Sequence, residues 1–196
     1  MHRHIRSHAR PPRVLQLDIN GVPQDWISIQ AAATHYATGE VVWADGESPL
    51  AILRGGHSAL TGLQSIIEVH PIVALRGAAR INLFDVQPVL AREKLLRRDR
   101  CTCAYCGECF AEAELTLEHI VPQARGGKST WMNLVAACQP CNSRKADRTP
   151  EQAGMPLLYL PYAPSRFEDF LLQGREIRAD VHAWLRARLP KGSRLN

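Results

Sequence analysis

The sequence has no long apolar run. Its uncharged apolar stretches, such as residues 71–75 and 134–138, are far shorter than the roughly 20 residues that a membrane-spanning helix needs. We therefore expect no transmembrane segment and no membrane partner. Residues 1–13 contain no acidic residue, but they also lack the apolar core of a signal peptide, so they are expected to form a flexible basic tail of a cytoplasmic protein.

Cysteine is absent before residue 101 and after residue 141. Four of the six cysteines form two C-x-x-C pairs: Cys103, Cys106, Cys138 and Cys141. Thiols stay reduced in the cytosol, so metal ligation explains this clustering better than disulfides do. Two such pairs predict a closed, tetrahedral structural zinc site. Cys101 and Cys109 are left over; ordinary reduced cysteines are the favoured interpretation, and a ligand set that includes one of them stays open.

Acidic residues are fewer than lysines and arginines, which gives a net charge of +5 and a pI near 9.1. Such a balance suits a polyanionic partner but is also common among other proteins, so it decides little alone. The basic residues bracket the cysteine region, with Arg97, Arg98 and Arg100 on one side. These three are either a solvated helix end or a DNA contact, and the sequence favours neither.

Internal repeats and low-complexity segments are also absent, and 196 residues suit one ordinary domain with a smaller module. Local patterns predict a small α+β domain at 14–84. Its expected elements are a strand at 14–21 ending in an Asn-Gly turn, a helix capped by Ser28 that runs to 37, a strand at 41–43, a loop at 46–62 and a strand at 65–75. Pro71 restricts the last strand to an edge or a bulge.

The second half of the chain has helical patterns on both sides of the cysteines. A helix is expected from Asp85 to the first cysteine, and another after Cys141 that ends at Thr149, before Pro150. Beyond them, 156–196 is expected to be a linker followed by C-terminal helices. Capping boxes predict helix starts at Thr149 with Gln152 and at Ser165 with Glu168, and the final helix is expected to stop at Pro190.

One apolar stretch contains two adjacent ionisable residues. In LTLEHIVPQARGG, residues 115–127, Glu118 and His119 interrupt a predicted strand that then runs into a basic, glycine-rich loop. Burying a carboxylate or an imidazole costs free energy unless each group finds a partner. Each of the two side chains therefore needs a partner in the fold, and His119 taken alone would be interpreted as a hydrogen-bonded strand histidine.

Three segments together carry a family resemblance: CAYCG, LTLEHIVPQARGG and WMNLVAACQPCNSRKADRTP. They resemble the HNH endonucleases of the ββα-metal class, in the subset stapled by two C-x-x-C pairs, over roughly residues 95–150. The resemblance implies an α+β protein whose HNH nuclease domain, at 85–155, has a ββα-metal core stapled by the four-cysteine zinc site. The small α+β domain would precede it, and the C-terminal helices would follow.

The resemblance also implies roles for individual residues. His119 would be the general base that takes a proton from water. Glu118 and Asn142 would hold one divalent cation, Mg²⁺ or Mn²⁺, through oxygen atoms. Asn133 would pin the loop between the strands and hold the histidine by hydrogen bonding. The family most often has Asp where this chain has Glu118, whose extra methylene can shift the cation.

A basic loop and a basic helix face would bind the substrate, double-stranded DNA. The residues expected to contact backbone phosphates are Arg125, Lys128, Arg144 and Lys145. The alternative is a zinc-stapled nucleic-acid-binding module that has lost catalysis. The presence of Glu118, His119 and Asn142 together favours the enzyme, and the sequence leaves the oligomeric state open.

Overall fold

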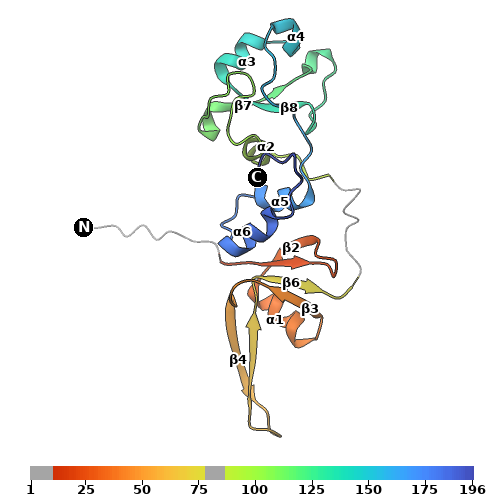
Figure 1. The fold of residues 1–196 in the computed structure, drawn as a ribbon, viewed down its shortest axis with the longest axis vertical. Coiled ribbons are helices and arrows are strands. Elements are labelled where there is room, and N and C mark those ends of the chain that lie inside the picture. Colours follow the sequence, from red (N-terminus) through yellow and green to blue (C-terminus); the bar gives the residue numbers. More distant parts are fainter. Residues whose placement is uncertain (1–10, 78–86) are drawn as a thin grey trace, which may run out of the picture. The chain divides into compact units, whose positions relative to one another are not determined.

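The computed structural model describes residues 11–77 and 87–196 (Figure 1). The chain divides into two compact units, Met1–Asn82 with Glu176–His182 and Leu83–Arg175 with Ala183–Asn196. Most of the expected basic tail, and the first residues of the helix expected from Asp85, lie outside the described residues. None of the helices in the described ranges is long and apolar enough to cross a membrane.

The first unit is built on a four-stranded sheet. Its strands are β1 (Val14–Leu17), β2 (Pro23–Ile27), β3 (Val41–Asp45) and β6 (Ile72–Leu75), in the order β2-β1-β6-β3. Strand β1 is antiparallel to β2 and parallel to β6. Helix α1 (Ile29–Ala37) packs Ala32 into the core, which also contains Val14 and Val73.

Two of the local predictions for this unit are confirmed. Ser28 caps α1, and its side chain accepts a hydrogen bond from the amide of Ala31. The turn after β1 is closed by Asp18, whose Oδ1 accepts from the amides of Asn20 and Val22. Gly21 has a φ of 83°, which favours glycine in this turn.

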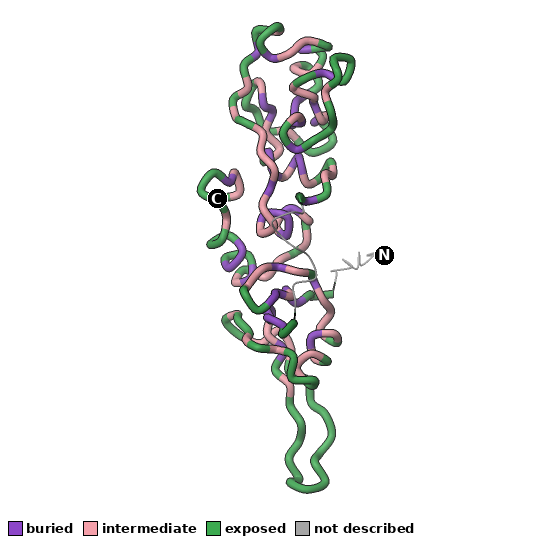
Figure 2. Tube along the Cα trace, turned by 90° about the vertical axis from the view of Figure 1, so that its right-hand side faces the viewer, coloured by how far each residue is buried: buried purple, intermediate pink, exposed green. Residues whose placement is uncertain are grey.

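Two other local predictions are wrong. The loop expected at 46–62 contains β4 (Ala51–His57), which pairs with β5 (Gln64–Val69) in a hairpin that Figure 2 shows as mostly exposed. A strand exposed on both faces lacks the apolar alternation that reveals strands in a sequence. The strand expected at 65–75 is two strands, since β5 ends before Pro71 and β6 begins after it. Proline has no N–H to donate to a ladder.

The second unit contains two strands followed by a helix. Strand β7 (Leu115–His119) is antiparallel to β8 (Leu134–Cys138), and α3 (Gln139–Lys145) packs against both strands (Figure 1). This order confirms the ββα core. Helix α3 begins before Asn142 and ends at Lys145 rather than at Thr149, because Ala146 takes a φ of 52° that ends the helix.

The second unit also contains several short helices, of which α2 (Arg92–Arg98) packs against β7 and β8. The others are α4 (Pro150–Ala153), α5 (Arg166–Leu172), the C-terminal part of α6 (Ala179–Arg186), and two 3₁₀ turns, η1 (Glu112–Glu114) and η2 (Gln123–Arg125). Both predicted capping boxes, at Thr149 and Ser165, are confirmed. The final helix ends at Arg186, and the helix expected from Asp85 begins only at Arg92.

Arg98 is a structural residue in the interior of the second unit. Its fully buried guanidinium donates to the carboxylate of Asp99 at 2.7 Å and to the carbonyl oxygens of Trp131, Leu134 and Tyr162 at 2.7 to 2.9 Å. Asp99 Oδ2 in turn accepts from the amide of Ala136 in β8. Arg98 is therefore neither a solvated helix end nor a DNA contact.

The segment expected to be a linker packs against the rest of the second unit. The amide of Leu158 donates to the carbonyl of Ala104, and the hydroxyl of Tyr159 donates to the carbonyl of Thr102. Both acceptors lie in the chain around the first C-x-x-C pair. These hydrogen bonds hold Leu158 and Tyr159 against that pair, which a free linker would not do.

Candidate active site and metal centre

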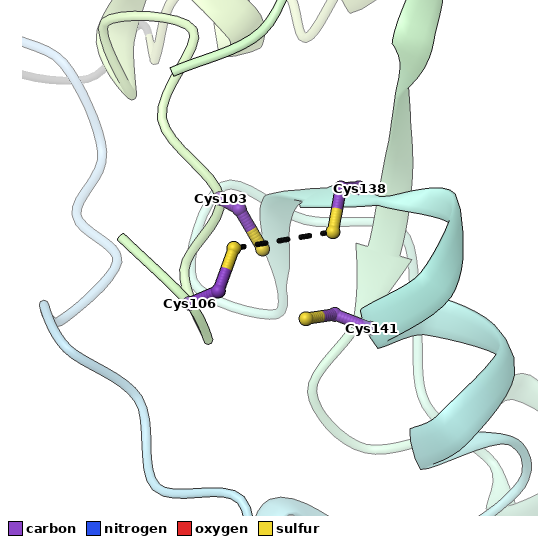
Figure 3. A group of neighbouring side chains, drawn as sticks. All are labelled: Cys103, Cys106, Cys138 and Cys141. Atoms are coloured by element: carbon purple, nitrogen blue, oxygen red, sulfur yellow. Dashed lines mark hydrogen bonds between the residues drawn. The ribbon is translucent and has the colours of Figure 1, made fainter. Parts of the chain in front are cut away.

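The four cysteines of the two C-x-x-C pairs converge on one point. Their sulfur atoms all lie within 4.8 Å of one another, and those of Cys106 and Cys138 are 4.0 Å apart (Figure 3). A tetrahedral zinc ion with Zn–S bonds of about 2.3 Å needs sulfurs about 3.8 Å apart. The cluster therefore fits zinc in number, chemistry and spacing. Cys101 and Cys109 are not part of this group.

Burial, backbone hydrogen bonds and neighbouring sulfurs shift the pKa values of the clustered cysteines. Burial opposes ionisation of Cys103, but hydrogen bonds from the backbone at Cys106, Cys138 and Tyr105 prevail and lower its pKa to about 7. The pKa of Cys141 is raised, first by burial and then by the neighbouring Cys138 and Cys103 sulfurs. Several thiolates this close together repel one another, and a bound dication stabilises them by neutralising their negative charge.

Helix α3 and strand β7 bring the predicted residues into one interface. Asn142 Nδ2 donates to Thr116 Oγ1 at 2.8 Å, and one helical turn later Lys145 Nζ lies 2.5 Å from Glu118 Oε1. Residues three apart share a helix face, and residues two apart share a strand face. Asn142 and Glu118 therefore occupy the same interface, as the family resemblance implied.

Lys145 does not have the role that we expected. Its side chain is fully buried, and its ammonium group contacts Glu118 and, at 2.7 Å, the carbonyl oxygen of His119. The expectation that it contacts DNA phosphates is wrong, because a buried, paired ammonium cannot reach the surface. Its spacing of three from Asn142 was the signal in the sequence that could have placed it against β7.

His119 ends strand β7 and is half-buried. Its Nε2 lies 3.0 Å from Ser129 Oγ, in the loop between the two strands. Asn133 pins the same loop, since its Oδ1 accepts from the amide of Val121 and its Nδ2 donates to the carbonyls of Val121 and Lys128. Among the described residues Asn133 makes no direct side-chain bond to His119. Sequence reasoning missed Ser129, because nothing local distinguishes it from other loop serines.

The other basic residues stay at the surface. Arg125, Lys128 and Arg144 are exposed, and Arg125 Nε donates to the carbonyl of Asp147 at 2.8 Å. That bond orients the guanidinium and leaves its terminal nitrogens available. The structure therefore leaves three of the four predicted phosphate contacts at the surface.

A half-buried tyrosine has its hydroxyl within electrostatic reach of both the cysteine cluster and Glu118. Tyr105, between the cysteines of the first pair, has its hydroxyl buried without a hydrogen-bond partner in the described part of the chain. Burial raises its pKa, and the negative charges of Glu118 and Cys103 raise it further. The Tyr105 hydroxyl therefore experiences the charges of both the cysteine cluster and Glu118.

Known proteins match this same region. Residues 103–158 match the family model described as HNH endonuclease. Two relatives, each named CRISPR-associated endonuclease Cas9, are 41% identical (Corynebacterium diphtheriae) and 39% identical (Actinomyces naeslundii) over 59 residues, which is 30% of this chain and 5% of each relative. The chain thus spans a small part of the relatives it matches.

A solved structure, the crystal structure of the Type II-C Cas9 enzyme from Actinomyces naeslundii, is 23% identical, with a TM-score of 0.29 over 53% of this chain and 13% of that chain. The family match contains both cysteine pairs, the Glu-His pair and both asparagines. Residues 103–158 therefore form a domain of the HNH endonuclease family.

Proposed function

We propose that the chain is a metal-dependent endonuclease that hydrolyses phosphodiester bonds of double-stranded DNA, with His119 as the general base. The observation that carries the proposal is the contact between α3 and β7, which places Asn142 against Thr116 and Lys145 against Glu118, next to His119. The relatives' shared name, an endonuclease, supports the same reaction class.

The residues present suit a one-metal hydrolysis. A half-buried imidazole at a strand end can take a proton from water while solvent still reaches it. The water then attacks phosphorus in line, the P–O3′ bond breaks, and the leaving 3′ oxygen takes a proton from solvent, which gives 5′-phosphate and 3′-hydroxyl ends. Ser129, in the loop that Asn133 pins, contacts the imidazole of His119, and Lys145 donates to the backbone carbonyl of the same residue.

The donor atoms also fit Mg²⁺ or Mn²⁺. Lys145 engages Oε1 of Glu118, so Oε2 can serve as a ligand, and Asn142 donates through Nδ2, so its amide oxygen can serve as another. Mg²⁺ accepts one or two protein oxygens and keeps several waters. When bound, the cation stabilises the negative charge that develops on the phosphate and on the leaving oxygen.

Zinc has a structural role in this proposal. Cys103 and Cys106 precede β7, whereas Cys138 and Cys141 lie where β8 passes into α3. A zinc ion on these four sulfurs joins the first pair to the start of α3, the helix that supplies Asn142. Arg125, Lys128 and Arg144 would bind backbone phosphates, which positions DNA without reading its sequence.

Cleavage of a defined, end-labelled duplex by the zinc-loaded full chain tests the proposal. We expect Mg²⁺- or Mn²⁺-dependent cuts with 5′-phosphate and 3′-hydroxyl ends, lost in Glu118→Ala and Asn142→Ala. Thr130→Ala, at an exposed position of the loop between β7 and β8, is the control and should cut as the wild type does.

The alternative, an inactive nucleic-acid-binding module, has one observation in its favour, since Lys145 already neutralises the Glu118 carboxylate. It predicts a different result in the same assay. The duplex would bind, as a mobility shift shows, but no metal would produce cuts. That outcome would replace the nuclease with the binding module.

A further inference from the structure

The only described side chain that hydrogen-bonds the His119 ring is a serine from the loop between β7 and β8. Ser129 Oγ lies 3.0 Å from Nε2 of His119. We infer that Ser129 is the positioning residue of His119: it accepts a hydrogen bond from Nε2–H, fixes the ring, and leaves Nδ1 as the atom that takes the proton from water. This inference rests on the proposed function of His119.

The loop that carries Ser129 is anchored on both sides of its turn. Asn133 Nδ2 donates at 3.0 Å to the carbonyl of Lys128, the residue directly before Ser129, while the other bonds of the Asn133 side chain hold the backbone of Val121. The hydroxyl therefore reaches the imidazole from a fixed backbone. A fixed hydroxyl orients a ring better than a mobile one, because less entropy is lost when the bond forms.

The turn also depends on a glycine. A Cβ added at Gly127 would lie 1.8 Å from the carbonyl oxygen of Val121, so only glycine lets the loop approach the backbone just after β7 this closely. The amide of Gly127 donates to the carbonyl of Pro122, which closes the turn. Gly127 and Asn133 thus act on His119 indirectly, through the placement of Ser129.

The hydrogen bond determines which ring nitrogen is basic. A neutral imidazole carries one proton, on Nδ1 or on Nε2, and the bond that one nitrogen makes determines the tautomer. Ser129 is exposed, so its own proton can be donated to solvent while Oγ accepts from Nε2–H. Without Ser129 the ring would exchange between tautomers and orientations, and only part of the population would present Nδ1 to water.

The test combines a spectroscopic and a kinetic measurement on the zinc-loaded full chain. The ring ¹⁵N chemical shifts of His119, assigned by their loss in His119→Gln, report the tautomer of the neutral ring. We expect the Nε2–H tautomer in the wild type and a mixture in Ser129→Ala. Ser129→Thr keeps the hydroxyl and should restore the wild-type shifts, and Thr130→Ala should leave them unchanged.

Single-turnover cleavage gives the second measurement. We expect Ser129→Ala to lower the cleavage rate by about tenfold to 100-fold, the size of effect that a misplaced catalytic group produces, with unchanged affinity for the duplex. Ser129→Thr should recover most of the rate. A purely structural role for Ser129 would not combine a shifted tautomer with an intact fold and intact binding.

Each outcome decides the inference. An Nδ1–H tautomer in the wild type, or Ser129→Ala with unchanged ring shifts, would overturn it. If the wild type cuts no DNA at all, the proposed function fails, whereas the ring shifts still determine whether Ser129 positions His119.

Discussion

The buried ion pair between Lys145 and Glu118 allows a sharp prediction about stability. Lys145→Met keeps the apolar stem of the side chain but removes the ammonium group, and it leaves the Glu118 carboxylate, only 7% exposed, without its counter-ion. Breaking a buried pair by removing one partner costs about 3 to 5 kcal/mol, because the remaining charge stays desolvated. The carbonyl of His119 loses a hydrogen bond as well.

Native-state hydrogen exchange of the zinc-loaded full chain measures this cost where it arises. Amides of β7 and β8 report the opening of this sheet separately from the first unit. A loss of about 3 kcal/mol or more should speed their exchange by at least about 100-fold. The double variant Glu118→Gln with Lys145→Met should exchange more slowly than Lys145→Met alone, because it buries no unpaired charge.

Lys128→Met is the matched control, since Lys128 is an exposed lysine of the same unit. It should change the free energy of opening by less than about 0.5 kcal/mol. If amide exchange in Lys145→Met is less than about fivefold faster than in the wild type, the ammonium does not stabilise the buried carboxylate. A double variant that is as unstable as Lys145→Met would refute the same reasoning.

Three other perturbations have expected outcomes. Metal analysis should find about one zinc per chain. Chelation of the zinc, or the double variant Cys138→Ser with Cys141→Ser, should unfold the second unit, because binding of a structural zinc provides folding free energy. A zinc-free chain that is still folded by circular dichroism would contradict this prediction. Arg98→Met should destabilise the second unit by more than about 3 kcal/mol in denaturant unfolding, because three carbonyls lose this donor and the buried Asp99 carboxylate loses its counter-ion. A loss below about 1 kcal/mol would contradict this prediction. Arg125→Ala with Arg144→Ala should lower the salt dependence of duplex binding by about 0.9 for each phosphate that the protein no longer neutralises, and an unchanged slope would remove both residues from the DNA interface.

The sequence predicted the parts of the site that depend on spacing. Two C-x-x-C pairs specify four thiols, and a Glu-His pair inside an apolar strand needs partners, so the cysteine cluster and the need of Glu118 for a buried partner followed from short-range patterns. The order of β7, β8 and α3 followed from the family resemblance. These features need no knowledge of which distant segments meet.

The features that the sequence did not predict depend on distant partners. Arg98 is buried because carbonyls from Trp131 and Tyr162 surround it, and neither lies near it in the chain. Lys145 has the sequence context of a surface charge, because its acceptors, Glu118 and the carbonyl of His119, lie 27 and 26 residues away in the chain. Strand β4 was missed for a different reason, since exposure on both faces removes the alternation on which strand prediction relies.

The role of His119 as the base of a metal-dependent nuclease is the central claim. Relaxation of a supercoiled plasmid by the zinc-loaded full chain, with Mg²⁺ or Mn²⁺ and beside His119→Ala, tests it most directly. We predict metal-dependent nicking by the wild type and a rate at least about 100-fold lower in His119→Ala, as expected when a general base is removed. An intact plasmid with every metal, or equal nicking by His119→Ala, would contradict the claim.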